Sequence, residues 1–440
     1  MKKYFLLTCL AAIAFVMLAA CGNEGGAAPT AGAAAEPDAD VVAAGGTVSV
    51  WTWDPAFNLA AMVEAERIYQ RMNPNFSLNM SEVPWDDIQT RIITMGMAGT
   101  LGDLPDIVLV QDNAFQKNVI DFPDVFVDLT DSGIDFRQFA AAKAAYSTVN
   151  GRNFGVPFDN GVTILALRTD IIGQAGLTIE DFTNITWEQF LALGIQVREA
   201  TGMALMSDGA VPDLLSIMTK SAGASMFNPD GSVHIVGNPV LEETIENILA
   251  LKDAGVVTVH SAWDEYIANF TQGHVAGTIQ GCWIMGSIQV ADDQAGHWAI
   301  THIPRLSRAA GATHYSVNGG SSWALTNNGN DPSLAIDFLA NTFAGSVELY
   351  ENILPSTGAL GTFLPAADSA VYQEPHPFFG GQTVFADITR FAASVPTFNP
   401  GVFYYEARDA VGMAMQMIIG GTPMAQALQE AQAEVEFHMN

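Results

Sequence analysis

Hydrophobic positions in the first part of the chain alternate between strand and helix patterns. Residues 47–53 alternate as a half-buried strand does, and the following hydrophobic residues recur at helical spacing after a cap at Asn58. Residues 76–80 predict a second strand, residues 86–97 a second helix, and the apolar run 105–110 a third strand. This β-α-β-α-β order predicts an α/β lobe with a mostly parallel sheet that is flanked by helices.

Polar and aromatic side chains stand where these predicted strands end. In open α/β sheets, ligands bind beyond the carboxyl ends of the strands. The rule nominates two dipeptides at strand ends and a third in the loop before the second helix: Trp53-Asp54, Asp112-Asn113 and Trp85-Asp86.

A glycine-rich turn at 150–155 leads into Val156-Pro157 and then into the strongly apolar run 162–168. Pro157 lacks an N–H and favours an extended residue before it, so the chain is expected to leave one sheet here and enter another. We therefore expect the first crossover between two lobes at this point, with Phe158, Asp159 and Asn160 facing the cleft between them. An ordinary strand entry with a solvated polar turn is the alternative interpretation.

The rest of the chain repeats the mixture of strands and helices. Thr186 to Gln189 has the pattern of a capping box, and Asn238-Pro239 is a typical helix start. Further helices are predicted at 263–272, 331–343 and 404–419 and after Thr422-Pro423, and further strands at 275–280, 298–304 and 321–326. The strand at 275–280 delivers Gly281-Cys282-Trp283 to another strand end.

Length and charge narrow the class of protein. The chain has 440 residues, more than one hydrophobic core usually serves, which favours two lobes. Its 17 lysines and arginines against 47 acidic residues give a net charge of −30, which repels nucleic acids and anionic membranes. A neutral or cationic small molecule is the better ligand. The three cysteines predict neither a disulfide nor a cysteine metal site.

The N-terminus has the pattern of a secretory signal. Lys2 and Lys3 precede an apolar run from 4 to 20, and small residues lead to Cys21. Leu-Ala-Ala-Cys resembles the bacterial lipobox, in which the cysteine becomes acylated; a plain secretory signal with a chance cysteine is the alternative. Residues 22–46 predict a flexible acidic tether. We thus expect an extracytoplasmic protein, held at the cell surface or in the periplasm by a lipid on Cys21.

Several of these motifs occur together in one family. The lipobox, Gly155-Val156-Pro157, Thr-Trp-x-x-Phe at 186–190, Gly-x-Trp at 281–283 and the aromatic helix start at 403–408 resemble the extracellular solute-binding proteins of family 1. These are the sugar-capturing components of bacterial ABC importers.

The resemblance implies a two-lobed periplasmic-binding-protein fold, type II-like, that closes around an oligosaccharide and docks on permease subunits. It implies crossovers near Val156-Pro157, near Ser316-Val317 and near Leu354-Pro355. The first lobe then comprises 47–157 and 317–355, and the second lobe comprises 158–316 and 356–440.

The resemblance also implies roles for single residues. Trp283 matches a tryptophan that stacks on a sugar ring, Tyr404 matches an aromatic residue at the same helix start, and Asp112 matches an acid that hydrogen-bonds sugar hydroxyls. This chain lacks the aromatic residue that some relatives have just before that acid. Trp53 or Trp85 is expected to supply the stacking surface instead.

Sugar recognition needs flat rings for the pyranose faces and carboxylates or amides for the hydroxyls. Pairs of Trp and Asp recur at 53–54, 85–86 and 263–264, which adds Trp263 to the candidates. Trp323 is a further candidate, and a place in the core is the alternative interpretation. Arg408 either donates to a hydroxyl or forms a structural ion pair.

Two other classes of protein remain open. A secreted carbohydrate-active hydrolase needs two facing carboxyl groups, and no pair stands out among the many acids. A binding protein for a cationic solute, such as a polyamine or peptide, suits the acidic composition. The eight scattered histidines form no metal motif. We expect a monomeric binding protein without cofactor or catalytic residues.

Overall fold

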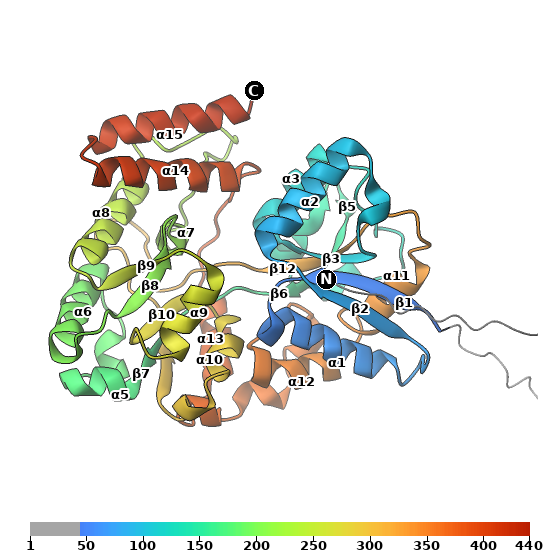
Figure 1. The fold of residues 1–440 in the computed structure, drawn as a ribbon, viewed down its shortest axis with the longest axis horizontal. Coiled ribbons are helices and arrows are strands. Elements are labelled where there is room, and N and C mark those ends of the chain that lie inside the picture. The colour runs from blue at the N-terminus through green and yellow to red at the C-terminus, as the bar shows by residue number, and fades with distance from the viewer. Residues whose placement is uncertain (1–44) are drawn as a thin grey trace, which may run out of the picture. The chain divides into compact units, whose positions relative to one another are not determined.

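A computed structural model describes residues 45–440 of the chain. The predicted signal, the lipidation site Cys21 and nearly all of the predicted tether lie outside these residues. Two lobes are visible, each built around its own sheet (Figure 1). None of the helices in this part of the chain is long and apolar enough to cross a membrane.

The first lobe is built on a five-stranded sheet in the order β2-β1-β3-β12-β6. Its strands are β1 (Thr47–Thr52), β2 (Ser77–Glu82), β3 (Ile107–Gln111), β6 (Gly155–Asp159) and β12 (Ser321–Leu325). The helices around it are α1 (Ala60–Tyr69), α2 (Trp85–Ala98), α3 (Asp112–Asp121), α4 (Ala141–Ala144), α11 (Ser333–Asn341) and α12 (Val347–Thr357). A small hairpin of β4 (Thr148–Val149) and β5 (Arg152–Asn153) precedes β6.

Helices cover both faces of this sheet, and β3 shows why. Ile107 and Leu109 pack into one hydrophobic cluster together with side chains of α1, α11 and α12, whereas Val108 and Val110 pack into another with side chains of α2 and α3. Successive side chains of a strand point to opposite faces, so a continuous apolar run is buried on both sides. The predicted flanking of the sheet by helices is thus confirmed (Figure 1).

The second lobe contains a three-stranded sheet, β10-β7-β11, and a separate strand pair, β8-β9. Its strands are β7 (Thr163–Arg168), β8 (Met206–Gly209), β9 (Val257–His260), β10 (Gly277–Gly281) and β11 (Trp298–Thr301). Its helices are α5 (Thr169–Ile172), α6 (Trp187–Thr201), α7 (Asp213–Ser221), α8 (Pro239–Asp253), α9 (Trp263–Thr271), α10 (Ile284–Gln289), α13 (Val384–Ala392), α14 (Tyr404–Ile419) and α15 (Met424–His438).

The prediction of a mostly parallel sheet is confirmed for the first lobe, where β12 alone runs against the other strands, but not for the sheet β10-β7-β11, in which both pairings are antiparallel. β1 pairs in parallel with β2 and β3, but β12 is antiparallel to both β3 and β6, and β7 is antiparallel to β10 and β11. Both exceptions are strands that start where the chain has just passed from one lobe to the other. β12 and β7 therefore run away from the junction, whereas β3, β6 and β10 run toward it.

Most local predictions from the sequence are confirmed within a few residues. The capping box at α6 is present: the Thr186 hydroxyl accepts from the Gln189 N–H, and the Gln189 side chain accepts from the Thr186 N–H. Helix α14 spans the predicted residues 404–419. The cap predicted at Asn58 is wrong, because the helical turn Pro55–Leu59 precedes α1 and Asp54 caps it.

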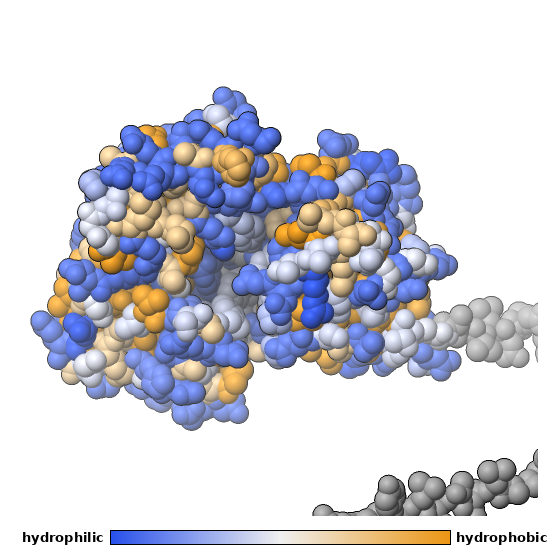
Figure 2. Space-filling model, turned by 45° about the horizontal axis from the view of Figure 1, so that its top comes forward, coloured by the Kyte–Doolittle hydropathy of each residue, from blue (hydrophilic) through white to orange (hydrophobic). Residues whose placement is uncertain are grey.

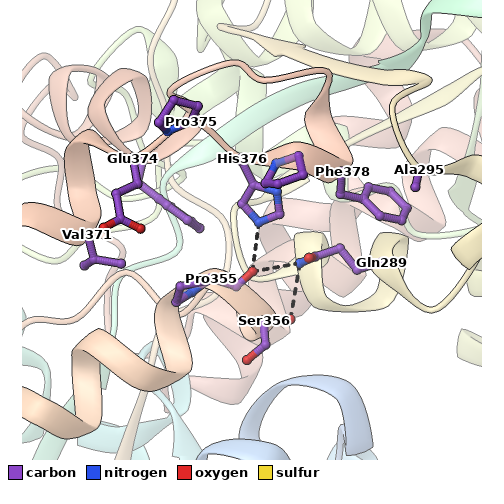
Figure 3. Close-up of a pocket in the computed structure, with 11 residues that line it drawn as sticks. Gln289, Ala295, Pro355, Ser356, Val371, Glu374, Pro375, His376 and Phe378 are labelled. Atoms are coloured by element: carbon purple, nitrogen blue, oxygen red, sulfur yellow. Dashed lines mark hydrogen bonds between the residues drawn. The ribbon is translucent and has the colours of Figure 1, made fainter.

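The resemblance implied a third connection between the lobes near Leu354-Pro355. This dipeptide stands inside α12, which is capped by Gly358 with a left-handed φ of +70°. Second-lobe side chains bind the carbonyls at the end of this helix: Gln289 donates to Pro355 O and Ser356 O at 3.2 Å each, and His376 Nε2 lies 2.9 Å from Pro355 O. Figure 3 shows both side chains directed at Pro355, beside a pocket of about 500 Å³.

Candidate functional site

A cavity of about 630 Å³ lies where side chains of both lobes meet. Figure 2 shows the molecular surface hollowed between the two lobes. The lining residues are Trp53, Asp54, Phe57, Glu82, Pro84, Trp85, Asp86, Gln111, Asp159, Ser261, Ala262, Trp263, Asp264, Trp283, Gly319, Gly320 and Ser321. The predicted candidates Trp53, Asp54, Trp85, Asp86, Asp159, Trp263 and Trp283 are therefore brought together, although they come from distant parts of the chain.

Two tryptophans from the first lobe form one side of the cavity. Trp53 directly follows β1 and Trp85 begins α2, and because β1 and β2 pair in parallel, these positions lie at the same edge of the sheet. The two ring centroids are 5.3 Å apart with an interplanar angle of 67°, an edge-to-face contact. This contact holds each ring in place and leaves both in the cavity wall.

Two tryptophans from the second lobe form the other side. Trp263 begins α9 and Trp283 follows β10; their ring centroids are 5.8 Å apart at an angle of 40°. The side chain of Trp263 is 40% exposed, an unusual exposure for so large an apolar ring. Trp283 is half-buried and also contacts Phe57 of the first lobe at 6.4 Å between centroids. The cavity thus has an indole pair on each of its two sides.

Asp54 has two functions in this geometry. Its carboxylate accepts a hydrogen bond from the Ala56 N–H at 2.9 Å, which caps the helical turn Pro55–Leu59, and the same side chain lines the cavity. Asn58, which sequence reasoning took for the cap, accepts from the backbone N–H groups of Trp53 and Asp54 instead. Burial raises the pKa of the Asp54 carboxyl to about 6, although the backbone hydrogen bonds lower it in part.

The raised pKa of Asp54 predicts a dependence of stability on pH. Between about pH 4 and pH 6 the folded protein holds a proton on Asp54 that the unfolded chain releases, so the free energy of unfolding should fall as the pH rises through this window. Asp54→Asn keeps the capping oxygen and should remove this part of the fall, at most about 2–3 kcal/mol. Urea unfolding from pH 4 to pH 8 measures it.

Asp86→Asn, at an exposed acid of the same cavity wall, is the matched control. The Asp54→Asn variant should keep a residual slope, because burial and the nearby Asp213 also raise the pKa of Asp208. A slope between pH 4 and pH 6 that equals that of wild type would contradict the assignment.

The floor of the cavity is formed by the ends of three neighbouring strands. Asp159 ends β6, Gln111 ends β3 and Ser321 begins β12, and the Ser321 hydroxyl donates to the Asp159 carboxylate at 2.6 Å. Gly319 and Gly320, with φ of +78° and +96°, precede Ser321 in left-handed conformations that favour glycine. Their backbone completes the floor where side chains would fill it.

Asp112 lies beneath this floor and does not line the cavity. Its carboxylate forms a buried ion pair with Lys143 and accepts from the Ser322 hydroxyl at 3.4 Å. The expected contact of Asp112 with sugar hydroxyls does not fit this arrangement, because Asp112 is not among the lining residues and its carboxylate is already bound by Lys143 and Ser322. Asn113, the next residue of α3, is half-buried and does not line the cavity either.

Phe158 and Trp323 belong to the core of the first lobe and not to the cleft. Both side chains are fully buried, and Phe158 packs against Trp323 and Phe343 with centroids 5.3 Å apart in each case. Because neighbouring residues of a strand face opposite sides, the position of Asp159 in the cavity places Phe158 in the core. The expectation that the Phe158 ring faces the cleft was wrong.

The aromatic start of α14 reaches the first lobe through Tyr405 and not through Tyr404. Tyr404 is buried in the core of the second lobe, and its hydroxyl donates to the Ser216 hydroxyl at 2.7 Å. The Tyr405 hydroxyl donates to the side-chain oxygen of Gln111, and its ring lies 6.5 Å from that of Trp85. Successive helix residues point about 100° apart, so only one of the two tyrosines can face the other lobe.

Charged residues of α14 add to this contact between the lobes. Lys117 of α3 forms an ion pair with Glu406 at 3.3 Å. Arg408 stacks over the Tyr405 ring, 4.7 Å from its centroid, and pairs with Asp409 at 2.7 Å. The structural ion pair that the sequence left open for Arg408 is the arrangement found, and Arg408 does not line the cavity.

Sequence reasoning missed several lining residues. Nothing in the local sequence marks Phe57 or Glu82 as a lining residue, and the backbone at 261–262 carries no motif that indicates a ligand. A Gly-Gly pair directly before a buried strand was the one available signal, since it marks a place of close backbone approach. Tyr405 is the neighbour of Tyr404, the residue that the aromatic helix start at 403–408 had nominated.

All charged side chains that line the cavity are acidic. Its lining includes the carboxyl groups of Asp54, Glu82, Asp86, Asp159 and Asp264 and no lysine or arginine. In the part of the chain that the structure describes, no group of three or more His, Cys, Asp or Glu side chains is placed to hold a metal ion. Flat rings on two sides with hydrogen-bond acceptors between them suit an uncharged ligand that carries many hydroxyl groups.

Comparison with known proteins finds relatives that are sugar-binding proteins. A lactose-binding protein of Rhizobium radiobacter is 39% identical over 385 residues, which are 87% of this chain and 91% of that protein. An arabinooligosaccharide-binding protein of Halalkalibacterium halodurans is 24% identical over 319 residues, 69% and 68% of the two chains.

Solved structures show the same fold. The ABC transporter associated binding protein from B. animalis subsp. lactis Bl-04, in complex with beta-1,6-galactobiose, superimposes with a TM-score of 0.75 at 18% identity and covers 89% of this chain and 96% of that one. The predicted two-lobed periplasmic-binding-protein fold is thereby confirmed.

The sequence profile of one family, described as bacterial extracellular solute-binding protein, matches residues 64–379. The chain belongs to this family of bacterial extracellular solute-binding proteins, as its motifs predicted.

Proposed function

We propose that this protein captures a short, neutral oligosaccharide between its lobes and delivers it to the permease of a bacterial ABC importer. The observation that carries the proposal is the pair of indoles on each side of the cavity, Trp53 with Trp85 and Trp263 with Trp283. Rings at these positions offer stacking surfaces to both faces of a pyranose, and each aromatic ring buries roughly 150–250 Å². The names of the relatives, which include lactose-binding and arabinooligosaccharide-binding proteins, support the same class of ligand.

The lining charges select among sugars. With five carboxyl groups and no basic side chain around it, the cavity repels sugar acids and sugar phosphates. Hydroxyl groups of a neutral sugar donate to these carboxylates in charge-assisted hydrogen bonds. The same lining also suits a cation, so a cationic solute is the second candidate.

Capture requires no covalent chemistry. The three connections near Asn160, near Asn318 and after Gly358 serve as the hinge, with the first lobe comprising 45–159 and 318–357 and the second lobe the remainder up to 440. A ligand that touches both indole pairs stabilises the closed arrangement of the lobes and shifts the population toward it. The protein acts as a monomer without enzymatic activity, held outside the cytoplasm by a lipid on Cys21.

Calorimetric titration of the purified protein tests the ligand class. The panel consists of lactose, β-1,6-galactobiose, arabinotriose, maltose, a uronic-acid disaccharide and spermidine. We expect at least one neutral sugar to bind with a dissociation constant in the micromolar range or below, about −8 kcal/mol or stronger, and the acidic sugar to remain silent.

Two results would change the assignment. Binding of spermidine with silence across the neutral sugars would favour the cationic solute. Release of monosaccharides from lactose or maltose on long incubation would indicate a hydrolase, which chromatography of the titrated samples detects.

A further inference from the structure

The Trp283 side chain is hydrogen-bonded to one of the connections between the lobes. Its indole N–H donates to the backbone carbonyl of Asn318 at 3.0 Å. Trp283 belongs to the second lobe, just after β10, whereas Asn318 lies in the connection that leads into β12 of the first lobe. An aromatic ring of the cavity is thus hydrogen-bonded to backbone at the junction of the lobes.

Three glycines make this contact possible. A Cβ atom at Gly281 would collide with the Trp283 nitrogen, and one at Gly319 would lie 2.8 Å from it. A Cβ atom at Gly161, in the first connection, would collide with the Asn318 carbonyl. The backbones of Gly281 and Gly319 therefore approach the indole itself, and that of Gly161 approaches the Asn318 carbonyl that accepts from it, at distances that favour glycine.

The buried side chain of Gln280 binds both Asn318 and Gly281. It is 2% exposed; its oxygen accepts from the Asn318 side-chain amide at 2.6 Å and from the Gly281 N–H at 3.0 Å. Its NH₂ group donates to the Asp213 carboxylate at 2.8 Å. Asn318 is held a second time, because its N–H donates to the Gly161 carbonyl at 2.7 Å.

This pattern of donors and acceptors is specific to glutamine. The amide oxygen faces two donors and the amide nitrogen faces a carboxylate, so an apolar side chain of the same length leaves three polar groups unpaired. A glutamate at this position keeps the acceptor but loses the donor when it is ionised, and places a second negative charge beside Asp213.

We propose that Gln280 is a positioning residue for ligand binding, which acts through Asn318 to fix the Trp283 ring at the junction of the lobes. The proposal rests on the proposed function for its link to the ligand. Gln280 does not line the cavity, so it acts on the ligand only through the ring that it orients.

The test uses Gln280→Met and Gln280→Glu, with Gln289→Met as the matched control. Gln289 is also a glutamine at the junction of the lobes that donates to backbone carbonyls, but it faces the other pocket (Figure 3). Lactose binding is measured by calorimetry, and the Trp283 indole N–H is followed by ¹⁵N–¹H NMR after assignment with Trp283→Phe.

We expect Gln280→Met to weaken lactose binding at least tenfold and to speed hydrogen exchange of the Trp283 indole at least tenfold. Gln289→Met should change neither, although both variants lower the melting temperature. In Gln280→Glu the loss of affinity at pH 7.5, relative to wild type, should shrink at pH 5.5, because a protonated glutamate can donate to Asp213 again.

An indole resonance and exchange rate in Gln280→Met that equal those of wild type would overturn the proposal. So would lactose binding within twofold of wild type. If the wild-type protein does not bind lactose, the proposed ligand is at fault, and the indole exchange still decides whether Gln280 positions Trp283.

Discussion

Replacing Trp283 with alanine is expected to weaken binding of the neutral sugar by about 50-fold or more. Loss of roughly 100 Å² of buried ring face at about 25 cal/mol per Å² removes about 2.5 kcal/mol, and each 1.4 kcal/mol is a factor of ten in the dissociation constant. The ring also contacts both Trp263 and Phe57, so its removal loosens the second-lobe wall of the cavity. Calorimetry with the best-binding sugar of the panel measures the change.

Measurements of the melting temperature separate the loss of affinity in Trp283→Ala from a loss of folding stability. Trp283 packs against hydrophobic clusters of both lobes, so Trp283→Ala should lower the melting temperature of the ligand-free protein by a few degrees. Trp298→Phe is the control: Trp298 lies in the core of the second lobe and donates to the Gln294 side chain, away from the cavity. Its replacement should lower stability without changing affinity. A folded Trp283→Ala protein that binds within threefold of wild type would refute stacking on Trp283.

Replacing Lys143 with methionine is expected to destabilise the protein by about 3–5 kcal/mol, because it leaves the Asp112 carboxylate buried without its partner. Burial already raises the pKa of Asp112 to about 6 in spite of Lys143, and the buried Asp159 lies near enough to raise it further. The loss should therefore be larger at pH 8 than at pH 5, where a proton can neutralise Asp112. Urea unfolding at the two pH values measures the difference.

The matched control is Arg137→Met. Arg137 pairs with Asp135 at 2.7 Å, but its side chain is 90% exposed, and such surface pairs contribute less than about 1 kcal/mol. The double variant Asp112→Asn/Lys143→Met should recover part of the loss, since it removes both charges. Equal stability of Lys143→Met and Arg137→Met would contradict a structural role for the buried pair.

This buried pair also explains why the ligand cavity has its shape. Gly320 has a left-handed φ of +96°, and a Cβ atom there would collide with the Asp112 carboxylate. The ion pair thus presses directly against the backbone of the cavity floor. Asp112 supports the site from below, which is a different role from the contact with hydroxyls that the family resemblance implied.

The amino-acid sequence by itself determined the elements and the kind of site. Hydrophobic periodicity identified the strands β1, β2, β3 and β12 of the first lobe, and capping residues identified helix starts such as Thr186, because both signals are local. Neighbouring Trp and Asp residues at strand ends predicted a cavity of rings and carboxylates, and three of these pairs line it: Trp53-Asp54, Trp85-Asp86 and Trp263-Asp264.

Tertiary structure alone decided which of two neighbouring side chains meets the cavity. Periodicity shows that Phe158 and Asp159 face opposite sides of a strand and that Tyr404 and Tyr405 point about 100° apart on a helix, but packing against the other elements chooses the buried one. The ion pair of Asp112 with Lys143 joins residues that are 31 positions apart. The strand directions of β7 and β12 follow from passage between the lobes. Contacts between residues distant in the chain are set by the packed fold, and no local pattern encodes them.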